Sequence, residues 1–476
     1  MKKFLTIILA ILFLGCGSNS SNNPNAIEEE NNLSFEDNKN YNFSSKVITI
    51  YVHGYQEEGY KRDNTYGLPW YNTFRENLEK YTKLPSLHQY NYIEKYSNML
   101  TSIDYYGKNA PEYYSEEDIQ DIEDITQKFK GGIPRYAMIV AKYAKDLLEH
   151  TPAEKINIVS VSMGSLITRW MIEKDLEHLA SEKKIEKWIT LEGVIRGNYA
   201  LSVANETIIH LFVDESPEIK QMHYNWIKEN LTPTPEILSN NYYKDILVGQ
   251  ISLTDGTQSG SLLKYVLPLY GGFQPNDGFQ LLKDTYFAKI EQTLQPPSHI
   301  LLHEDHVNIK NSVATMINVA NFLNPKKRVR ITLEETTVND IHEDVNSKNQ
   351  SAEILFESKI YSPYSDTLWD LHKAIDERLY YSGALQIYNY QNNGEKKRIN
   401  QILFDGFIDQ KEEELELYIQ GFEIDRSSTY NISEINKVSK KESLGKIDQY
   451  IPLKNGTYPI ESDDWQGVLK IEILEI

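Results

Sequence analysis

Apolar runs and amphipathic stretches alternate between residues 47 and 324. Residues 47–52 (VITIYV) and 156–161 (INIVSV) are largely apolar on both faces, which is typical of buried parallel strands. Between them, residues 133–150 place apolar side chains at helical spacing on one face: Ile133, Ala137, Val140, Ala141, Ala144, Leu147 and Leu148. This alternation of strand and helix indicates an α/β domain.

The pattern changes after Pro325. Short segments with alternating apolar and polar residues follow, at 329–333, 384–388, 415–419 and 469–473. A period of two, with turn signals such as Asn392-Asn393-Gly394 between the segments, predicts β-strands. We therefore expect a mostly-β accessory module over residues 325–476, built as a sandwich of one or two units. It could bind a glycan, a polymer or a partner, or simply cap the preceding domain.

The N-terminus has the composition of an export signal. Residues 1–16 begin with Lys2 and Lys3, continue with an apolar run over residues 4–14, and end in Gly15-Cys16. The run is too short to cross a bilayer comfortably, which favours a cleaved signal peptide. Residues 17–46 are rich in Asn, Ser and Glu, so we expect a flexible tether. No later apolar run approaches about 18 residues, so we expect no membrane-spanning helix in the mature chain.

The segment Phe13-Leu14-Gly15-Cys16 resembles a bacterial lipoprotein signal box. This resemblance implies that Cys16 becomes the lipidated first residue of the mature protein. The expected location is then the cell envelope, anchored by lipid to a bacterial membrane, which is the outer membrane in a Gram-negative cell. An ordinary secretion signal with an incidental cysteine is the alternative.

Composition narrows the possible partners. The chain has 476 residues, with 49 Lys and Arg against 69 Asp and Glu, for a net charge of −20. This charge argues against nucleic acid as the main partner, because phosphate binding needs a basic surface. Cys16 is the single cysteine, which excludes an intramolecular disulfide and a cysteine-based zinc site.

Residues 160–164 (SVSMG) join the strand at 156–161 to a helix that begins near Leu166. A nucleophile on such a sharp turn needs small residues two positions before and after it, and Ser160 and Gly164 meet this requirement. The pattern predicts that Ser162 is the nucleophile. Ser160 and Ser165 are the alternatives that mutagenesis has to exclude.

These residues resemble the α/β-hydrolase superfamily, and within it the bacterial lipases and esterases. The G-x-S-x-G motif of the family corresponds to residues 160–164, with Ser160 in place of the first glycine. The strand that ends in His53-Gly54 is similar to the start of the family's oxyanion loop, and residues 192–197 are a loose match to a loop that follows a later strand. The resemblance implies a mostly parallel central sheet flanked by helices over residues 47–324. It also implies oxyanion-binding N–H groups on Tyr55 and Met163.

The resemblance further implies a cap or lid inserted at about residues 200–245. Its apolar residues would favour acyl-chain substrates: Ile208, Ile209, Leu211, Phe212, Val213, Trp226 and Ile227. Alternatively, these residues pack a peripheral helix against the core.

The partners of Ser162 are expected in the order Ser, Asp, His. Asp277, in Asn276-Asp277-Gly278, resembles the acid-bearing loop of the family, and Asp255, in Thr254-Asp255-Gly256, is the competing acid. His306, in Asp305-His306-Val307-Asn308-Ile309, resembles the catalytic histidine. His299 and His303 are the alternatives to it.

These residues predict an exported serine hydrolase that cleaves carboxylic esters, most like a lipase or esterase. Its expected partners are an ester or lipid substrate and, through the anchor at Cys16, a membrane. The chemistry requires no metal and no organic cofactor. The alternatives are a serine amidase or thioesterase, and an inactive surface-binding lipoprotein in which the β module carries the function.

Overall fold

The computed structural model describes residues 43–56, 59–87, 96–203, 216–233, 237–256, 276–287, 298–341, 351–362, 365–370, 387–424 and 441–476. The predicted signal peptide and almost all of the predicted tether lie outside these residues. So do residues 204–215 and 234–236 of the predicted cap or lid. Within the described residues, no helix is both long enough and apolar enough to span a membrane.

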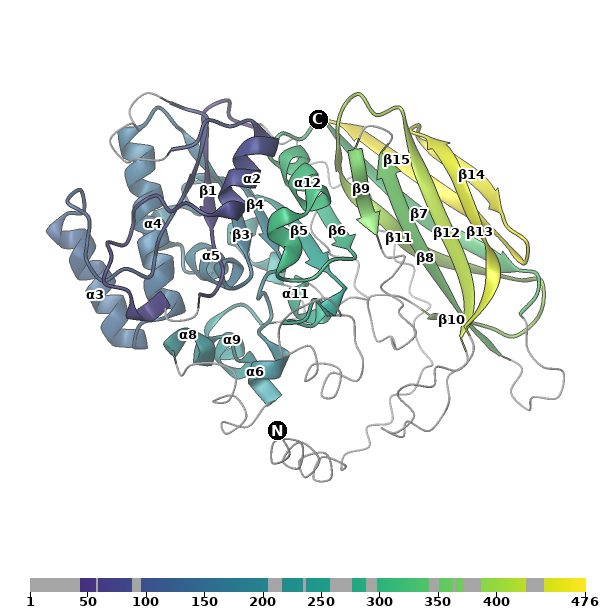
Figure 1. The fold of residues 1–476 in the computed structure, drawn as a ribbon, viewed down its shortest axis with the longest axis horizontal. Helices are drawn as coiled ribbons and strands as arrows, with labels where there is room; N and C mark the ends of the chain where they lie inside the picture. Colours follow the sequence, from purple (N-terminus) through teal and green to yellow (C-terminus); the bar gives the residue numbers. More distant parts are fainter. Residues whose placement is uncertain are drawn as a thin grey trace. The chain divides into compact units, whose positions relative to one another are not determined.

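Six parallel strands form the centre of the fold (Figure 1). In chain order they are β1 (Val47–Val52), β2 (Met99–Ser102), β3 (Lys155–Val161), β4 (Ile185–Leu191), β5 (Leu247–Leu253) and β6 (Ser298–Leu302). Their order across the sheet is β6-β5-β4-β3-β1-β2, and every neighbouring pair is parallel. Strands β1, β4 and β5 are buried along their whole length, as the apolar runs in the sequence require for a sheet covered on both faces.

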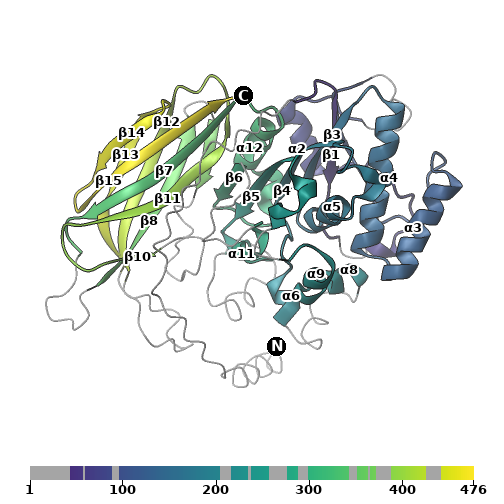
Figure 2. The same ribbon diagram turned by 180° about the vertical axis from the view of Figure 1, so that it is seen from behind.

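Helices cover both faces of this sheet. Side chains of α4 (Ile133–His150) and α5 (Met163–Glu173) pack on one face, against Ile48 and Ile158. Side chains of α2 (Thr73–Thr82) and α12 (Val313–Leu323) pack on the other, against Tyr51 and Val159. Successive residues of a strand point to opposite faces, so each strand contributes to both cores. Figure 2 gives the reverse view of this arrangement. The prediction of an α/β domain with a mostly parallel sheet flanked by helices is confirmed, and α4 has the predicted bounds.

The other helices that the structure describes lie between these elements. They are η1 (Gly59–Lys61), α3 (Glu116–Phe129), η3 (Leu176–His178), α6 (Tyr199–Val203), α8 (Pro217–Gln221), α9 (Tyr224–Asn230), η4 (Ile237–Ser239), η5 (Asn241–Tyr243), α11 (Leu282–Thr285) and η7 (Asn308–Asn311). In the predicted cap or lid, Trp226 of α9 stacks on Trp170 of α5 with 5.2 Å between the ring centroids. This part of the segment therefore packs on the core.

After residue 325, the described residues form antiparallel strands. Strands β7 (Lys327–Val338), β11 (Glu395–Ile408), β14 (Gly456–Glu461) and β15 (Trp465–Glu475) belong to one sheet. The other sheet contains β8 (Ala352–Ser362), β9 (Ser365–Asp370), β10 (Ile387–Tyr390), β12 (Glu414–Ile424) and β13 (Lys441–Pro452). Phe356 of β8 contacts Trp465 of β15 with 4.8 Å between the ring centroids, so the inner faces of the two sheets share a core.

The first of these sheets is continuous with the parallel sheet, which the sequence did not predict. Strand β11 pairs with β6 where Asp405 lies opposite His299, so that ten strands form one sheet. The Asp405 carboxylate is buried and accepts hydrogen bonds from both Arg328 and Arg330 of β7. These charge-assisted bonds satisfy a buried acid at the point where the parallel strands meet the antiparallel ones.

Candidate functional site

Ser162 occupies a strained turn between β3 and α5. Its φ of 52° and ψ of −124° lie in a region of backbone angles that residues other than glycine seldom adopt. The turn is held by its backbone: the Ser162 N–H donates to Leu191 O at 2.9 Å, and the Val194 N–H donates to Ser162 O at 3.1 Å. A Cβ atom at Gly164 would lie 2.4 Å from the carbonyl oxygens of both Val52 and His53, so only glycine fits there.

The other two candidate serines lie in different surroundings. Ser160 is fully buried, and its hydroxyl accepts a hydrogen bond from Trp188 Nε1 at 3.0 Å. Ser165 is also fully buried, and its hydroxyl donates to the carbonyl oxygen of Ser160 at 3.2 Å. Both hydroxyls are therefore engaged within the core beneath the turn.

The loop after β1 lies directly against Ser162. A Cβ atom at Gly54 would be 2.9 Å from Ser162 Cβ and 3.4 Å from its Oγ. Tyr105 fixes this loop by donating from its hydroxyl to His53 O at 2.7 Å and to Gly54 O at 3.0 Å. Tyr55 follows Gly54 in the loop, and Met163 is the first residue of α5, so the two residues predicted to bind an oxyanion flank the Ser162 turn.

His53 stays neutral in this loop. Burial lowers its pKa to about 3. Because its Nδ1 lies 2.8 Å from the Gly54 carbonyl oxygen, Nδ1 carries the proton and donates it there. The Tyr105 ring stacks on the imidazole with 4.1 Å between centroids. His53 is thus fixed as a support for the loop.

His306 reaches Ser162 from the loop after β6. Its Nε2 lies 3.1 Å from Ser162 Oγ, and its Nδ1 lies 2.7 Å from Asp277 Oδ2. The His306 backbone N–H also donates to the Asp277 carbonyl oxygen at 3.0 Å, which ties the two loops together. An imidazole held between a hydroxyl and a carboxylate can take the hydroxyl proton and make the oxygen nucleophilic.

The Asp277 carboxyl group is arranged to hold a negative charge. It is almost fully buried, and its Oδ1 accepts hydrogen bonds from the backbone N–H groups of Phe279 at 2.8 Å and Gln280 at 2.7 Å. Backbone donors of this kind stabilise the ionised form of a carboxyl group. The turn has Gly278 at a φ of 93°, which suits glycine, so the Asn-Asp-Gly sequence fits this geometry.

The alternative residues from the sequence pair differently. Asp255 lies against His303, with 3.3 Å between Oδ2 and Nε2. His299 is in β6, where its ring makes an edge-to-face contact with Tyr286 with 4.6 Å between the centroids, and burial lowers its pKa to about 4. The structure thus brings Ser162, His306 and Asp277 together, and gives Asp255 a different histidine.

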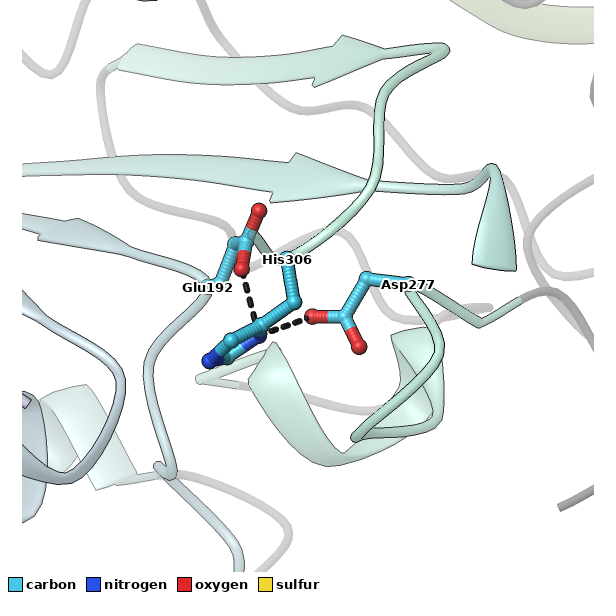
Figure 3. Close-up of side chains that lie close together, drawn as sticks. All are labelled: Glu192, Asp277 and His306. Carbon is cyan, nitrogen blue, oxygen red and sulfur yellow. Dashed lines mark hydrogen bonds and ion pairs between the residues drawn. The ribbon is translucent and has the colours of Figure 1, made fainter. Parts of the chain in front are cut away.

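Glu192 is a further residue of the site, and its sequence pattern predicted only that it lies in a loop. It follows β4 directly, its φ is 48°, and its side chain is fully buried. Its Oε2 lies 2.5 Å from His306 Nδ1, beside the contact with Asp277 (Figure 3). Burial raises the pKa of Glu192 to about 8. A charged residue at the carboxyl end of a buried parallel strand was the signal in the sequence, because sites form at that edge.

The two acids control the charge of His306. Burial by itself lowers the pKa of His306. The interactions of the ring with the carboxyl groups of Glu192 and Asp277 outweigh burial and hold the pKa of His306 well above its usual value. The imidazolium form of His306 is therefore stabilised at this position. A group that accepts a proton during a reaction needs such stabilisation of its protonated form.

Among the described residues, one group has ligand atoms close enough together to be considered for a metal ion. It consists of Glu192, Asp277 and His306, whose ligand atoms lie within 4.8 Å of one another. Ligand atoms about 2.0–2.2 Å from one ion would stand about 3 Å or more apart. The distances from Nδ1 to the two carboxyl oxygens are 2.5 and 2.7 Å. These are the distances of groups that share a proton, so we assign hydrogen bonding to this cluster.

No protein-family model matches the sequence, and a search of curated proteins returns no match. Among solved structures, the mature form of Bacillus licheniformis lipase BlEst2 is 14% identical, with 59% of this chain and 91% of the lipase covered and a TM-score of 0.34. Legionella pneumophila phospholipase PlaB in complex with thio-NAD is 10% identical, with 86% of this chain and 90% of the phospholipase covered and a TM-score of 0.34. A lipase-esterase related protein from Clostridium acetobutylicum is 15% identical, with 58% of this chain and 95% of that protein covered and a TM-score of 0.28. Similarity this distant assigns no activity, so the chemistry has to be judged from the residues of the site.

Proposed function

We propose that this protein is a serine hydrolase of the α/β-hydrolase type that cleaves carboxylic esters through an acyl-enzyme on Ser162. One observation carries the proposal: His306 joins the hydroxyl of Ser162, at 3.1 Å, to the carboxyl group of Asp277, at 2.7 Å. The strained turn at Ser162 supports it, because strain of this kind at a polar residue is usually retained for function.

In the first half of the reaction, His306 accepts the Ser162 proton while Oγ forms a bond to the ester carbonyl carbon. The backbone N–H groups of Met163 and Tyr55 would donate to the resulting oxyanion. His306 then gives its proton to the alkoxide oxygen as the carbon–oxygen bond breaks, and the alcohol leaves. Asp277 remains ionised and stabilises the imidazolium throughout.

In the second half, water replaces the alcohol. His306 takes a proton from the water as its oxygen adds to the acyl carbon. The bond to Ser162 then breaks, His306 returns the proton to Oγ, and the carboxylic acid is released. Each step moves one proton through Nε2, so the mechanism depends on a neutral His306 at the start.

We propose an acyl ester as the substrate class, because the sequence of the cap or lid segment at about 200–245 is rich in apolar residues. An amide or thioester would use the same groups. The inactive lipoprotein remains the alternative from another class, and the hydrogen-bonded Ser162, His306 and Asp277 weigh against it.

Location follows from the signal sequence, and we propose lipid anchoring of the exported protein at Cys16. Metabolic labelling with a radioactive fatty acid, compared between the wild type and Cys16→Ala, tests this. Label in the wild type alone supports the anchor, and equal absence of label supports an ordinary secretion signal.

The test of the activity uses the full chain, purified in detergent, with a fluorophosphonate probe and p-nitrophenyl esters of increasing acyl length. We expect labelling and turnover that Ser162→Ala abolishes and that Ser160→Ala and Ser165→Ala retain. Matched p-nitroanilides and thioesters separate ester from amide and thioester cleavage. A folded wild-type protein that neither reacts with the probe nor hydrolyses any of these substrates would exclude the proposed function.

A further inference from the structure

Two carboxyl groups stand at one nitrogen of His306. Figure 3 shows Asp277 and Glu192 approaching Nδ1 from separate loops. The carboxyl oxygens lie 2.7 Å and 2.5 Å from this nitrogen, respectively. A neutral imidazole that accepts a proton at Nε2 carries a single proton at Nδ1, and one carboxylate is enough to receive it. The second carboxyl group therefore has no place in the mechanism proposed above.

The two carboxyl groups have opposite surroundings. Asp277 accepts backbone hydrogen bonds from Phe279 and Gln280, which stabilise its ionised form. Glu192 is fully buried and its Oε2 lies 2.5 Å from His306 Nδ1, but neither of its oxygens accepts a backbone hydrogen bond among the residues that the structure describes. An ionised carboxylate without backbone donors in a buried site is costly, so of the two acids Glu192 keeps the proton.

The charges at the site lead to the same assignment. The charged groups that act on Glu192 are His306 and Asp277, and burial is the main cause of its raised pKa of about 8. Two adjacent buried carboxyl groups do not both ionise readily, and the one with fewer donors keeps its proton. If both were ionised at neutral pH, they would keep His306 as an imidazolium, which cannot accept the proton of Ser162.

The backbone fixes Glu192 in this position. Its φ of 48° is in the left-handed region, and its N–H donates to Ile251 O on β5 at 2.9 Å. The next residue, Gly193, packs so closely on Ser165 that an added Cβ would lie 2.8 Å from Ser165 Cβ, and its carbonyl oxygen accepts from Gln280 Nε2 at 2.8 Å. Gln280 therefore links the Glu192 loop to the loop that carries Asp277. Such a constrained arrangement is not needed for a residue that merely fills space.

We propose that Glu192 is a positioning residue that works as a neutral acid: its protonated carboxyl group supports the imidazole of His306 from the Nδ1 side and leaves Asp277 as the single ionised partner. The function of His306 as a base rests on the activity proposed above. The protonation of Glu192 does not depend on it.

This arrangement has a consequence for titration. As the pH rises, the protons of His306 and Glu192 leave in two steps that belong to the pair, because the two groups are in direct contact. Glu192 Oε2 is 2.5 Å from Nδ1, so the ring nitrogens of His306 report both steps. Without a titrating group at position 192, His306 reports a single step.

The experiment follows the ring of His306 by NMR in the full chain labelled with ¹⁵N-histidine, with the signal assigned by its loss in His306→Gln. We expect two titration steps in the wild type and one in Glu192→Gln. Glutamine keeps the shape of the neutral acid but does not titrate. A single step in the wild type, or two steps that persist in Glu192→Gln, would overturn the proposal. Both readings are available whether or not any ester is hydrolysed, so a failure of the proposed function is recognised separately.

Kinetics test the positioning role. We expect Glu192→Gln to keep kcat/KM within about tenfold of the wild type, because it preserves the support of the ring. We expect Asp277→Asn to lose about 10³–10⁴-fold, because it removes the ionised partner. Glu192→Ala, which removes the support, should lower kcat by at least about tenfold, and Glu192→Gln should restore most of that loss. A Glu192→Gln enzyme as impaired as Asp277→Asn would identify Glu192 as the ionised acid and refute the proposal.

Discussion

The imidazole of His306 lies 3.1 Å from the hydroxyl of Ser162, although 144 residues separate the two along the chain. The sheet accounts for this proximity. Ser162 follows β3 and His306 lies in the loop after β6, and parallel strands end at the same edge of the sheet. Loops at that edge can combine side chains from distant parts of the sequence, which is why sites of α/β proteins form there.

The pairing of each acid with its histidine predicts different effects for the two aspartates. Asp277→Asn should lower kcat/KM by about 10³–10⁴-fold, because it removes the negative charge beside Nδ1 of His306. Asp255→Asn is the matched control: Asp255 pairs with His303 at 3.3 Å, so we expect kcat/KM within about tenfold of the wild type. The measurement is ester hydrolysis by both variants at saturating and limiting substrate. Equal losses would show that Asp277 is not the specific partner of His306.

The charge of His306 predicts how activity depends on pH. The protonated ring cannot accept the Ser162 proton, and the neighbouring carboxyl groups raise the pKa of His306 above its usual value. Activity should therefore rise with pH through a midpoint above about 6.5, the ordinary value for histidine. A profile of kcat/KM between pH 5 and 9 measures this midpoint. Full activity at pH 5.5 would contradict the raised pKa.

Gly54 limits the space beside the nucleophile. In Gly54→Ala the new methyl group would lie 2.9 Å from Ser162 Cβ, which has to move. A shift of this kind at a reacting atom can cost about 10²-fold, so kcat/KM should fall by that order while the melting temperature changes little. Gly131→Ala is the control for activity: its methyl group meets nothing within 4 Å, and the strain of alanine at a φ of 84° should lower the melting temperature but leave kcat/KM unchanged. Equal kcat/KM in both variants would show that the Gly54 loop does not constrain Ser162.

A buried ion pair connects α5 to two loops. Arg169 Nε lies 2.7 Å from Glu173 Oε1, and the Arg169 guanidinium also donates to Ile195 O and Thr232 O. Arg169→Leu leaves the Glu173 carboxylate buried without its positive partner, with neutral hydrogen-bond donors from Tyr243 and Thr232, and we expect a loss of about 3–5 kcal/mol of unfolding free energy. Lys46→Ala, which breaks the exposed pair with Glu154, should cost less than about 1 kcal/mol. Denaturant unfolding compares the two, and similar losses would contradict the buried pairing.

Asp284 makes stability depend on pH. Burial raises its pKa to about 7 in the folded protein, from 3.8. The folded state then binds more protons than the unfolded state between these values, so the contribution of Asp284 to stability falls as the pH rises from about 4 to 7. The difference in stability between Asp284→Asn and the wild type should therefore shift in favour of the variant when the pH is raised from 4.5 to 8.5. Thermal unfolding of both proteins at the two pH values measures this shift. Asp63→Asn, at a side chain that is 84% exposed, should show no such difference. A constant difference for Asp284→Asn would exclude the raised pKa.

Local patterns in the sequence were enough to predict the main elements. Residues 133–150 form a helix because their apolar side chains repeat at helical spacing, and residues 47–52 form a buried strand because both of their faces are apolar. The small residues around Ser162 predicted the sharp turn, since Gly164 is the residue that fits between α5 and the carbonyl groups after β1. Each of these predictions depends on residues that are neighbours in the chain.

The tertiary structure decided which side chains meet. Asp255 and Asp277 each precede a glycine in a turn, so the sequence left both open as the acid, and only the folded loops bring Asp277 to His306 and Asp255 to His303. The approach of Glu192 to Nδ1 and the pairing of β11 with β6 also depend on contacts between distant segments. The periodicity of a sequence reports which face of an element is buried, because burial selects apolar side chains at regular spacing. It does not report which loops meet at the edge of a sheet, because that depends on the packing of all the strands and helices that lie between them.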